Sequence, residues 1–149
     1  MASGAEVINI SEALILPAIN NNVDLGSNGE RFKDLYTAGT TLLGGVLALD
    51  GAVQSITSAH TIINATSSKS AIGSDAGGFT MSISNGNYSG QLKYLYMGKD
   101  DGGAAVLEGA NFVGTSLAFN NKGEGATLMW STADTNWYCV GVNGAVWTA

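Results

Sequence analysis

Short runs in which apolar and polar residues alternate cover most of the chain, and turn-forming residues interrupt them at short intervals. Helix formers such as Glu, Lys, Arg and Gln are rare, whereas Gly, Thr, Ser, Asn and Val recur. Alternation with a period of two, bounded by Gly and Asn, is typical of β-strands. We therefore predict an all-β fold with strands at residues 13–19, 31–36, 40–43, 45–50, 52–57, 61–66, 78–84, 91–97, 104–108, 116–119, 126–130, 136–142 and 145–148.

Turn signals separate these strands. The Asn-Gly pairs at 28–29, 85–86 and 143–144 predict tight hairpins, because both residues tolerate a positive φ. Residues 131–136 predict a turn between a strand that ends at Trp130 and one that starts at Trp137. Many short strands in close succession favour an antiparallel β-sandwich or a jelly-roll-like fold.

The chain divides into two parts of different character. Residues 1–58 contain the only proline and a repetitive Gly-rich stretch, whereas residues 59–149 contain all three Trp residues and a regular rhythm of strands and turns. A polar, Ser- and Thr-rich segment at 56–70 joins them. We predict a short N-terminal arm or attachment module over 1–58. A compact antiparallel β-sandwich or jelly-roll-like head is expected over 59–149.

Charge is scarce in this sequence. Only 12% of the residues are charged, against about 25% in a typical soluble protein, while 45% are hydrophobic and 21 of the 149 are Gly. A lone domain with so few charges has difficulty covering its surface with solvated groups, so we expect part of that surface to be buried in an oligomer.

The sign and the spread of the charges exclude some partners. The net charge is −6 and the six basic residues are scattered, which argues against binding to nucleic acid or to an anionic membrane. The N-terminus lacks the basic segment and long apolar run of a secretion signal, so we expect the chain to be made and folded in a reducing cytoplasm, without secretion.

Residues that carry chemistry are few and isolated. His60 lies in a polar stretch that predicts an exposed loop, and Cys139 lies in an apolar run that predicts a small buried hydrophobe. Asp100 and Asp101 are adjacent and lack the alternating spacing of a calcium loop. We therefore predict no catalytic residue, no cofactor and no metal. Glycan hydrolysis by two of the 12 acidic residues stays open as a minor hypothesis.

The three tryptophans lie in or beside predicted strands of the head. Aromatic residues in strands most often fill a core or form cross-strand pairs, and each buries about 150–250 Å². We expect Trp130, Trp137 and Trp147 to fill the core of the head. The alternative is that one or two of them form an exposed platform for a sugar at its apex.

Two stretches resemble proteins of tailed bacteriophages. The segment "DLGSNGERFKDLYTAGT" resembles a motif of phage fibre and appendage proteins, matched here by Asp24, Leu25, Gly26, Ser27, Arg31, Phe32, Leu35, Tyr36 and Gly39. The later part is similar in composition and rhythm to compact β-rich heads of phage virion proteins, at Gly90–Lys93, Thr127–Trp130, Asn136–Trp137 and Asn143–Ala145.

The resemblance implies a homotrimeric, non-enzymatic component of the virion surface. A short arm with a compact head, without a long shaft, favours a capsid decoration (cement) protein that binds the major capsid protein or another virion protein. Alternatively, the chain is a short tail fibre or head fibre that binds a host polysaccharide or protein. Exposed aromatic residues at the apex of the head would favour this alternative, and the candidates are Trp130, Trp137, Trp147, Tyr88, Tyr94 and Tyr96. In the arm, we expect the contacts between copies to involve Leu25, Gly26, Arg31, Phe32, Leu35 and Tyr36.

Overall fold

The computed structural model describes residues 8–10, 15–17, 37–41, 52–59 and 61–149. The chain divides into two units, Met1–Val46 and Leu47–Ala149. In the first unit, β1 (Ile8–Ile10) pairs in antiparallel fashion with β2 (Ile15–Pro17). The strands predicted at 31–36 and 45–50, and most of that at 40–43, lie outside the described residues.

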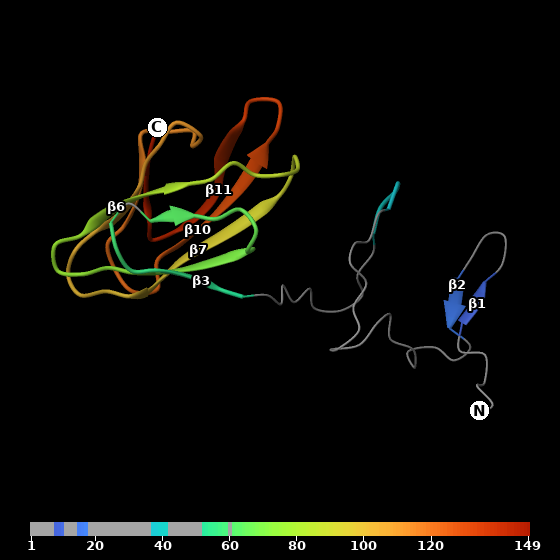
Figure 1. Ribbon diagram of the computed structural model, residues 1–149, viewed down its shortest axis with the longest axis horizontal. Coiled ribbons are helices and arrows are strands. Elements are labelled where there is room, and N and C mark those ends of the chain that lie inside the picture. Colours follow the sequence, from blue (N-terminus) through green and yellow to red (C-terminus); the bar gives the residue numbers. More distant parts are fainter. Residues whose placement is uncertain (1–7, 11–14, 18–36, 42–51, 60) are drawn as a thin grey trace. The chain divides into compact units, whose positions relative to one another are not determined.

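The second unit contains two mixed β-sheets of five strands each, which enclose one apolar core (Figure 1). The first sheet has the spatial order β11 (Asn136–Asn143), β10 (Gly125–Ser131), β7 (Leu92–Lys99), β5 (Lys69–Gly73) and β3 (Gln54–Ile56). The second sheet has the order β12 (Val146–Thr148), β9 (Ser116–Phe119), β8 (Ala105–Leu107), β6 (Phe79–Ile83) and β4 (Ile62–Ile63). The predicted all-β fold is thus confirmed in the described residues, in a sandwich-like form.

The sequence pattern located nine of the ten strands of this unit. Each strand predicted from residue 52 onwards corresponds to an observed one, from β3 and β4 to β12. The pattern missed β5, which begins at the end of the segment interpreted as a linker. Its residues Ser70 and Ala71 are small and give a weak alternation, although Ser70 is fully buried. Strand β3 lies N-terminal to the boundary predicted at 58/59 and pairs with β5.

The expected antiparallel arrangement is wrong for half of each sheet. β3, β5 and β7 are parallel neighbours, as are β4, β6 and β8. From β3 to β8 the chain changes sheet after every strand, so it returns to each sheet in the same direction as before (Figure 1). Within these two sheets, the pairs formed by β7 with β10, β10 with β11, β8 with β9 and β9 with β12 are antiparallel. Alternation identifies a strand but does not identify its neighbour.

The same sheet changes overturn two of the predicted Asn-Gly hairpins. Asn85–Gly86 lies between β6 and β7, and Asn143–Gly144 joins the end of β11 to the segment before β12; each pair of strands belongs to different sheets. The pair at 28–29 lies outside the described residues. Gly144 does adopt a positive φ of 74°. Gly86 instead lies against the Trp130 ring, where a Cβ atom would overlap the indole. The turn predicted at 131–136 does connect an antiparallel pair, β10 and β11.

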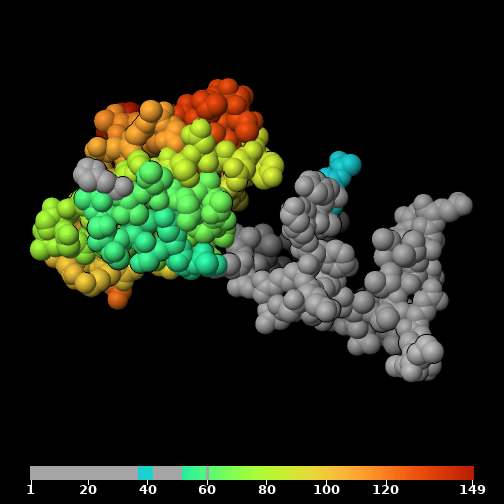
Figure 2. Space-filling model, viewed as in Figure 1, coloured from blue at the N-terminus to red at the C-terminus, as the bar shows by residue number. Residues whose placement is uncertain are grey.

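Trp130 and Trp137 lie in the core of the unit. They are cross-strand partners on β10 and β11, and their ring centroids are 5.4 Å apart with a 56° tilt. Trp137 Nε1 donates a hydrogen bond to the Ser84 carbonyl at 2.9 Å. Segments distant in sequence, from green to red, pack closely against one another around this core (Figure 2). The contact between the two rings and the hydrogen bond to Ser84 therefore anchor the β10–β11 end of the first sheet in the core.

A single side chain connects the two sheets at their opposite edges. Gln54, on β3, donates from Nε2 to the Ile62 carbonyl on β4 at 2.8 Å. Its Oε1 accepts hydrogen bonds from the Asn64 backbone N–H at 2.8 Å and from the buried Ser70 hydroxyl at 3.1 Å. The amide thus substitutes for the backbone pairing that the two edge strands do not make with each other.

This bridge predicts that Gln54→Met destabilises the protein. The side chain keeps its length, but the Asn64 N–H, the Ser70 hydroxyl and the Ile62 carbonyl lose their partner. We expect the free energy of unfolding to fall by about 2 kcal/mol, measured by urea denaturation with tryptophan fluorescence. Ser55→Ala, at the exposed neighbouring position, is the control and should change stability by less than about 0.5 kcal/mol. Equal stability of the two variants would contradict the bridging role.

Candidate functional site

The outward face of the first sheet is unusually apolar. An outer face of a sandwich is normally polar, with apolar side chains on the inner face only. Here, Leu92, Tyr96 and Met129 point outward and are 41%, 42% and 38% exposed, respectively. The strand register places Leu92, Met129 and Tyr138 side by side in one cross-strand row over β7, β10 and β11. This row gives the sheet a second apolar face in addition to its core face.

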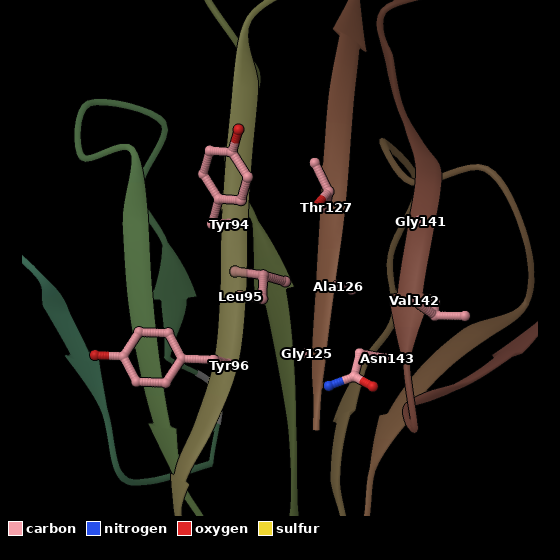
Figure 3. A pocket seen from close by; sticks show the side chains of 9 residues that line it. All are labelled: Tyr94, Leu95, Tyr96, Gly125, Ala126, Thr127, Gly141, Val142 and Asn143. Atoms are coloured by element: carbon pink, nitrogen blue, oxygen red, sulfur yellow. The ribbon is translucent and has the colours of Figure 1, made fainter. Parts of the chain in front are cut away.

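Two further rows combine tyrosines with glycines. Tyr94 lies in a row with Thr127 and Gly141, and Tyr96 lies in a row with Gly125. Tyr94 and Tyr96 project from β7, and we call these two residues the ridge (Figure 3). Gly125 on β10 and Gly141 on β11 place no side chain on the same face, and we call them the trough. The sheet therefore carries a raised and a hollow strip next to each other.

The hollow strip is a groove of about 410 Å³. It is lined by Tyr94, Leu95, Tyr96, Gly125, Ala126, Thr127, Gly141, Val142 and Asn143 (Figure 3). None of these residues carries a carboxylate, an amine or a guanidinium, although the chain has a net charge of −6. The groove can thus accept apolar and uncharged polar groups without leaving an ion unpaired.

The two glycines of the trough differ in their surroundings. A Cβ atom at Gly125 would lie 3.1 Å from the Leu95 carbonyl oxygen, so the neighbouring strand restricts this position. A Cβ atom at Gly141 would have no neighbouring heavy atom within 4 Å. A side chain can therefore be added at Gly141 without a clash in the fold.

Lys93 lies on the opposite, inward side of β7, directly beneath this face. It is fully buried, and its Nζ donates to the Ser67 carbonyl at 2.7 Å and to the Ser67 hydroxyl at 3.1 Å. Desolvation lowers the pKa of its amine from 10.5 to about 8. Asn64 Oδ1 in turn accepts a hydrogen bond from the Ser67 hydroxyl at 2.7 Å. The amine is therefore held by neutral groups of one loop.

A second groove lies on the other sheet and has a different character. It has a volume of about 460 Å³ and is lined by Ile62, Thr80, Met81, Ser82, Glu108 and Gly109. Its walls include a carboxylate and two hydroxyls but no aromatic ring. No cationic side chain in its lining pairs with the carboxylate, and no group of titratable residues converges there.

The structure separates the three tryptophans. Trp130 and Trp137 are buried, at 2% and 0% exposure, and Trp130 Nε1 has no hydrogen-bond partner. Trp147 is 44% exposed on the edge strand β12, and its Nε1 donates to the Val113 carbonyl at 3.2 Å. Trp130 and Trp137 therefore lie in the core, whereas Trp147 lies at the surface and does not fill the core as expected. The residues expected to form contacts in the arm, namely Leu25, Gly26, Arg31, Phe32, Leu35 and Tyr36, lie outside the described residues, as does His60.

The remaining candidates for chemistry have local structural roles. Asp100 accepts a hydrogen bond from the Gly102 N–H at 2.8 Å, and Asp101 forms an ion pair with Lys99 at 2.5 Å. Cys139 is half-buried against the core, and desolvation raises the pKa of its thiol. Among the described residues, no three His, Cys, Asp or Glu side chains gather as they would around a metal ion.

Sequence reasoning identified Tyr94 and Tyr96 as possible surface aromatics but missed the trough and the buried lysine. Glycine inside a strand is the signal for close approach of another group, and Gly125 and Gly141 lie within or beside predicted strands. Lys93 gave no signal, because a charge in an alternating strand normally marks the solvent side.

Comparisons with known proteins place no constraint on this surface. No protein-family model matches the chain, and no curated protein matches it. Within the described ranges, no helix has the length and apolar character needed to cross a membrane.

The buried amine predicts a pH-dependent stability. Between pH 8 and 10.5 the unfolded chain keeps the Lys93 proton while the folded protein releases it, so stability rises with pH in this window. We expect the free energy of unfolding of the wild type to gain roughly 2 kcal/mol relative to Lys93→Met between pH 7 and 9.5. Urea denaturation at several pH values measures this difference.

The comparison with a variant is needed because other groups also contribute to the pH dependence; burial raises the pKa of the Cys139 thiol, for example. Lys122→Met removes an exposed lysine and serves as the matched control; its stability should follow the wild type at every pH. Parallel curves for the wild type and Lys93→Met would show that Lys93 keeps an ordinary pKa and would refute the prediction.

Proposed function

We propose that this chain is a non-enzymatic structural protein of a bacteriophage virion: a homotrimeric capsid decoration protein that binds the capsid surface and stabilises it. The resemblance of residues 24–39 to phage appendage proteins motivates this proposal. The observation that carries it is the largely apolar outer face of the first sheet, with its row of Leu92, Met129 and Tyr138, which favours burial against other protein chains.

An apolar outer face is unfavourable on a protein that acts alone in water. Burial of such a face against another protein yields roughly 25 cal/mol for each Å² of apolar surface removed from water. The low fraction of charged residues, 12%, supports the same conclusion for the chain as a whole. A protein that functions by packing needs such a surface and does not need converging titratable groups.

Fibre function is the second candidate. Tyr88, in the loop between β6 and β7, is the most exposed of the large apolar or aromatic side chains described, at 73%. An exposed tyrosine on a loop can stack on a sugar ring or contact a receptor protein. On this alternative the chain would be a short tail fibre or head fibre, and host polysaccharide or protein would be its ligand.

Binding to capsids tests the proposal directly. Particles of the phage that encodes this sequence, stripped of this chain, should regain it at saturable, regularly spaced sites when purified protein is added. Because the protein binds the assembled capsid and not the opened one, it should raise the thermal stability of the particle. At a free concentration of 100 times Kd the stabilisation is about 2.7 kcal/mol per site.

The control is the same particle with bovine serum albumin, which should leave the melting temperature unchanged. Absence of saturable binding, or binding without any gain in heat resistance, would refute the role as a decoration protein. Binding of the purified chain to host cells, lost in Tyr88→Ala, would establish the fibre function instead.

A further inference from the structure

We propose that the outer face of the first sheet is an interface between copies of this chain, in which the ridge of one copy enters the trough of the next. The ridge is formed by Tyr94 and Tyr96 and the trough by Gly125 and Gly141, as defined above. This inference goes beyond the proposed role in a virion and does not depend on it.

The ridge and the trough are complementary in shape and lie on the same face. Tyr96 is 42% exposed and its ring extends from β7 to the side away from Gly125, while the hollow on the other side of β7 measures about 410 Å³ (Figure 3). Both glycine positions present backbone only, so an aromatic ring can approach the strands closely (Figure 3). A surface that offers both the knob and the hole fits a second copy of itself.

The strand register makes this fit consistent with rotational symmetry. Tyr94 lies in the same cross-strand row as Gly141, and Tyr96 lies in the same row as Gly125. A rotation about an axis parallel to the strands does not change the position of a residue along the strand direction, so each cross-strand row keeps its level along that axis. The rotation therefore brings each tyrosine of one copy to the level of the glycine of its own row in the next copy. Closed oligomers, including the trimer proposed above, use such an axis.

Charge favours a second copy over a different partner. Two copies with a net charge of −6 repel each other unless their contact surface is neutral, and the residues that line the groove carry no charged group. A different partner would more typically be selected by complementary charges at the rim. The single cation in these rows, Lys69, lies at the β5 end of the row, on the far side of Tyr94 from the trough.

The contact also explains which groups surround the groove. Thr127 and Asn143 place a hydroxyl and an amide in its lining, where the phenol hydroxyl of an inserted tyrosine can find a hydrogen-bond partner. Tyrosine is enriched at interfaces for this reason, because its ring is buried while its hydroxyl stays hydrogen-bonded.

The test introduces opposite charges on the two sides of the proposed contact. Gly141→Asp adds a charge to the trough without a clash, and Tyr94→Lys replaces a ridge residue. Sedimentation equilibrium of the full chain over a dilution series gives the association constant of each variant. Either single change should weaken association about a hundredfold, because it buries an unpaired charge.

The double variant Tyr94→Lys/Gly141→Asp should recover at least tenfold of that loss, since the new charges then face each other in every contact. Ala118→Asp, on the outer face of the second sheet, is the matched control and should associate like the wild type. Tryptophan fluorescence and melting curves check that all variants fold.

Three results would overturn the inference: a wild type that stays monomeric at high micromolar concentration, single variants that associate like the wild type, or a double variant as weak as the singles. Each of these outcomes is distinct from a failure of the decoration role, because capsid binding is measured separately on particles.

Discussion

The pleat of β7 and β10 is the constraint on which the rest of this unit depends. Successive side chains in a strand point to opposite faces, so each residue buried in the core fixes its neighbour on the outside. Leu95 and Met97 fill the core from β7, which sends Tyr94 and Tyr96 outward. No slip of one residue is tolerated, because it would bring the tyrosines inside and expose the core residues.

The antiparallel register between β7 and β10 then aligns the outward residues into rows. Leu95 lies opposite Ala126, and the pairs next to them place Tyr94 opposite Thr127 and Tyr96 opposite Gly125. Core packing and the geometry of the outer groove are therefore one property of the fold. A substitution that shifts β7 would alter both together, whereas a change at Gly141 alters only the groove.

The inward side of β7 also contains the least favourable feature of the core. Lys93 takes an inward position in the same alternation as Leu95, and its amine is satisfied by one carbonyl and one hydroxyl of Ser67. Burial removes the amine from water, and no carboxylate compensates for the lost hydration of its charge. The charged form is therefore destabilised, and this lowers the pKa. The hydrogen bonds of Lys93 to Ser67 hold the loop between β4 and β5 against β7, next to β5, the strand that the sequence pattern missed.

Much of the secondary structure could be predicted from the sequence, but little of its arrangement. Alternation located the strands because apolar residues at every second position mark a half-buried strand. In β7, however, both faces are largely apolar; of its two lysines, Lys93 lies on the buried face and Lys99 ends the strand. The pattern therefore could not tell which side of β7 forms the core.

Strand order failed for a related reason. A parallel neighbour is set by the crossing of the chain to the other sheet, and no local pattern encodes that crossing. The hydrogen bonds of Gln54 join residues 8 to 16 positions apart, and only the fold brings these together. Likewise, the trough depends on the fold, which places Gly125 and Gly141 beside the tyrosines of β7, about 30 to 45 positions away in the sequence.

The first sheet has two apolar faces, and the second sheet of the described unit covers only one of them. In a sandwich, one face is covered by the other sheet, and the strands need no further partner for their backbone pairing. Selection for stability of the isolated unit would therefore replace Leu92, Met129 and Tyr96 by polar residues, since the described fold leaves each of them partly exposed to water. Their presence on adjacent strands, beside two glycines that keep a groove open, is explained when the outer face has a partner of its own. The scarcity of charge across the chain follows from the same requirement, because surface that is buried on assembly must be neutral before assembly as well.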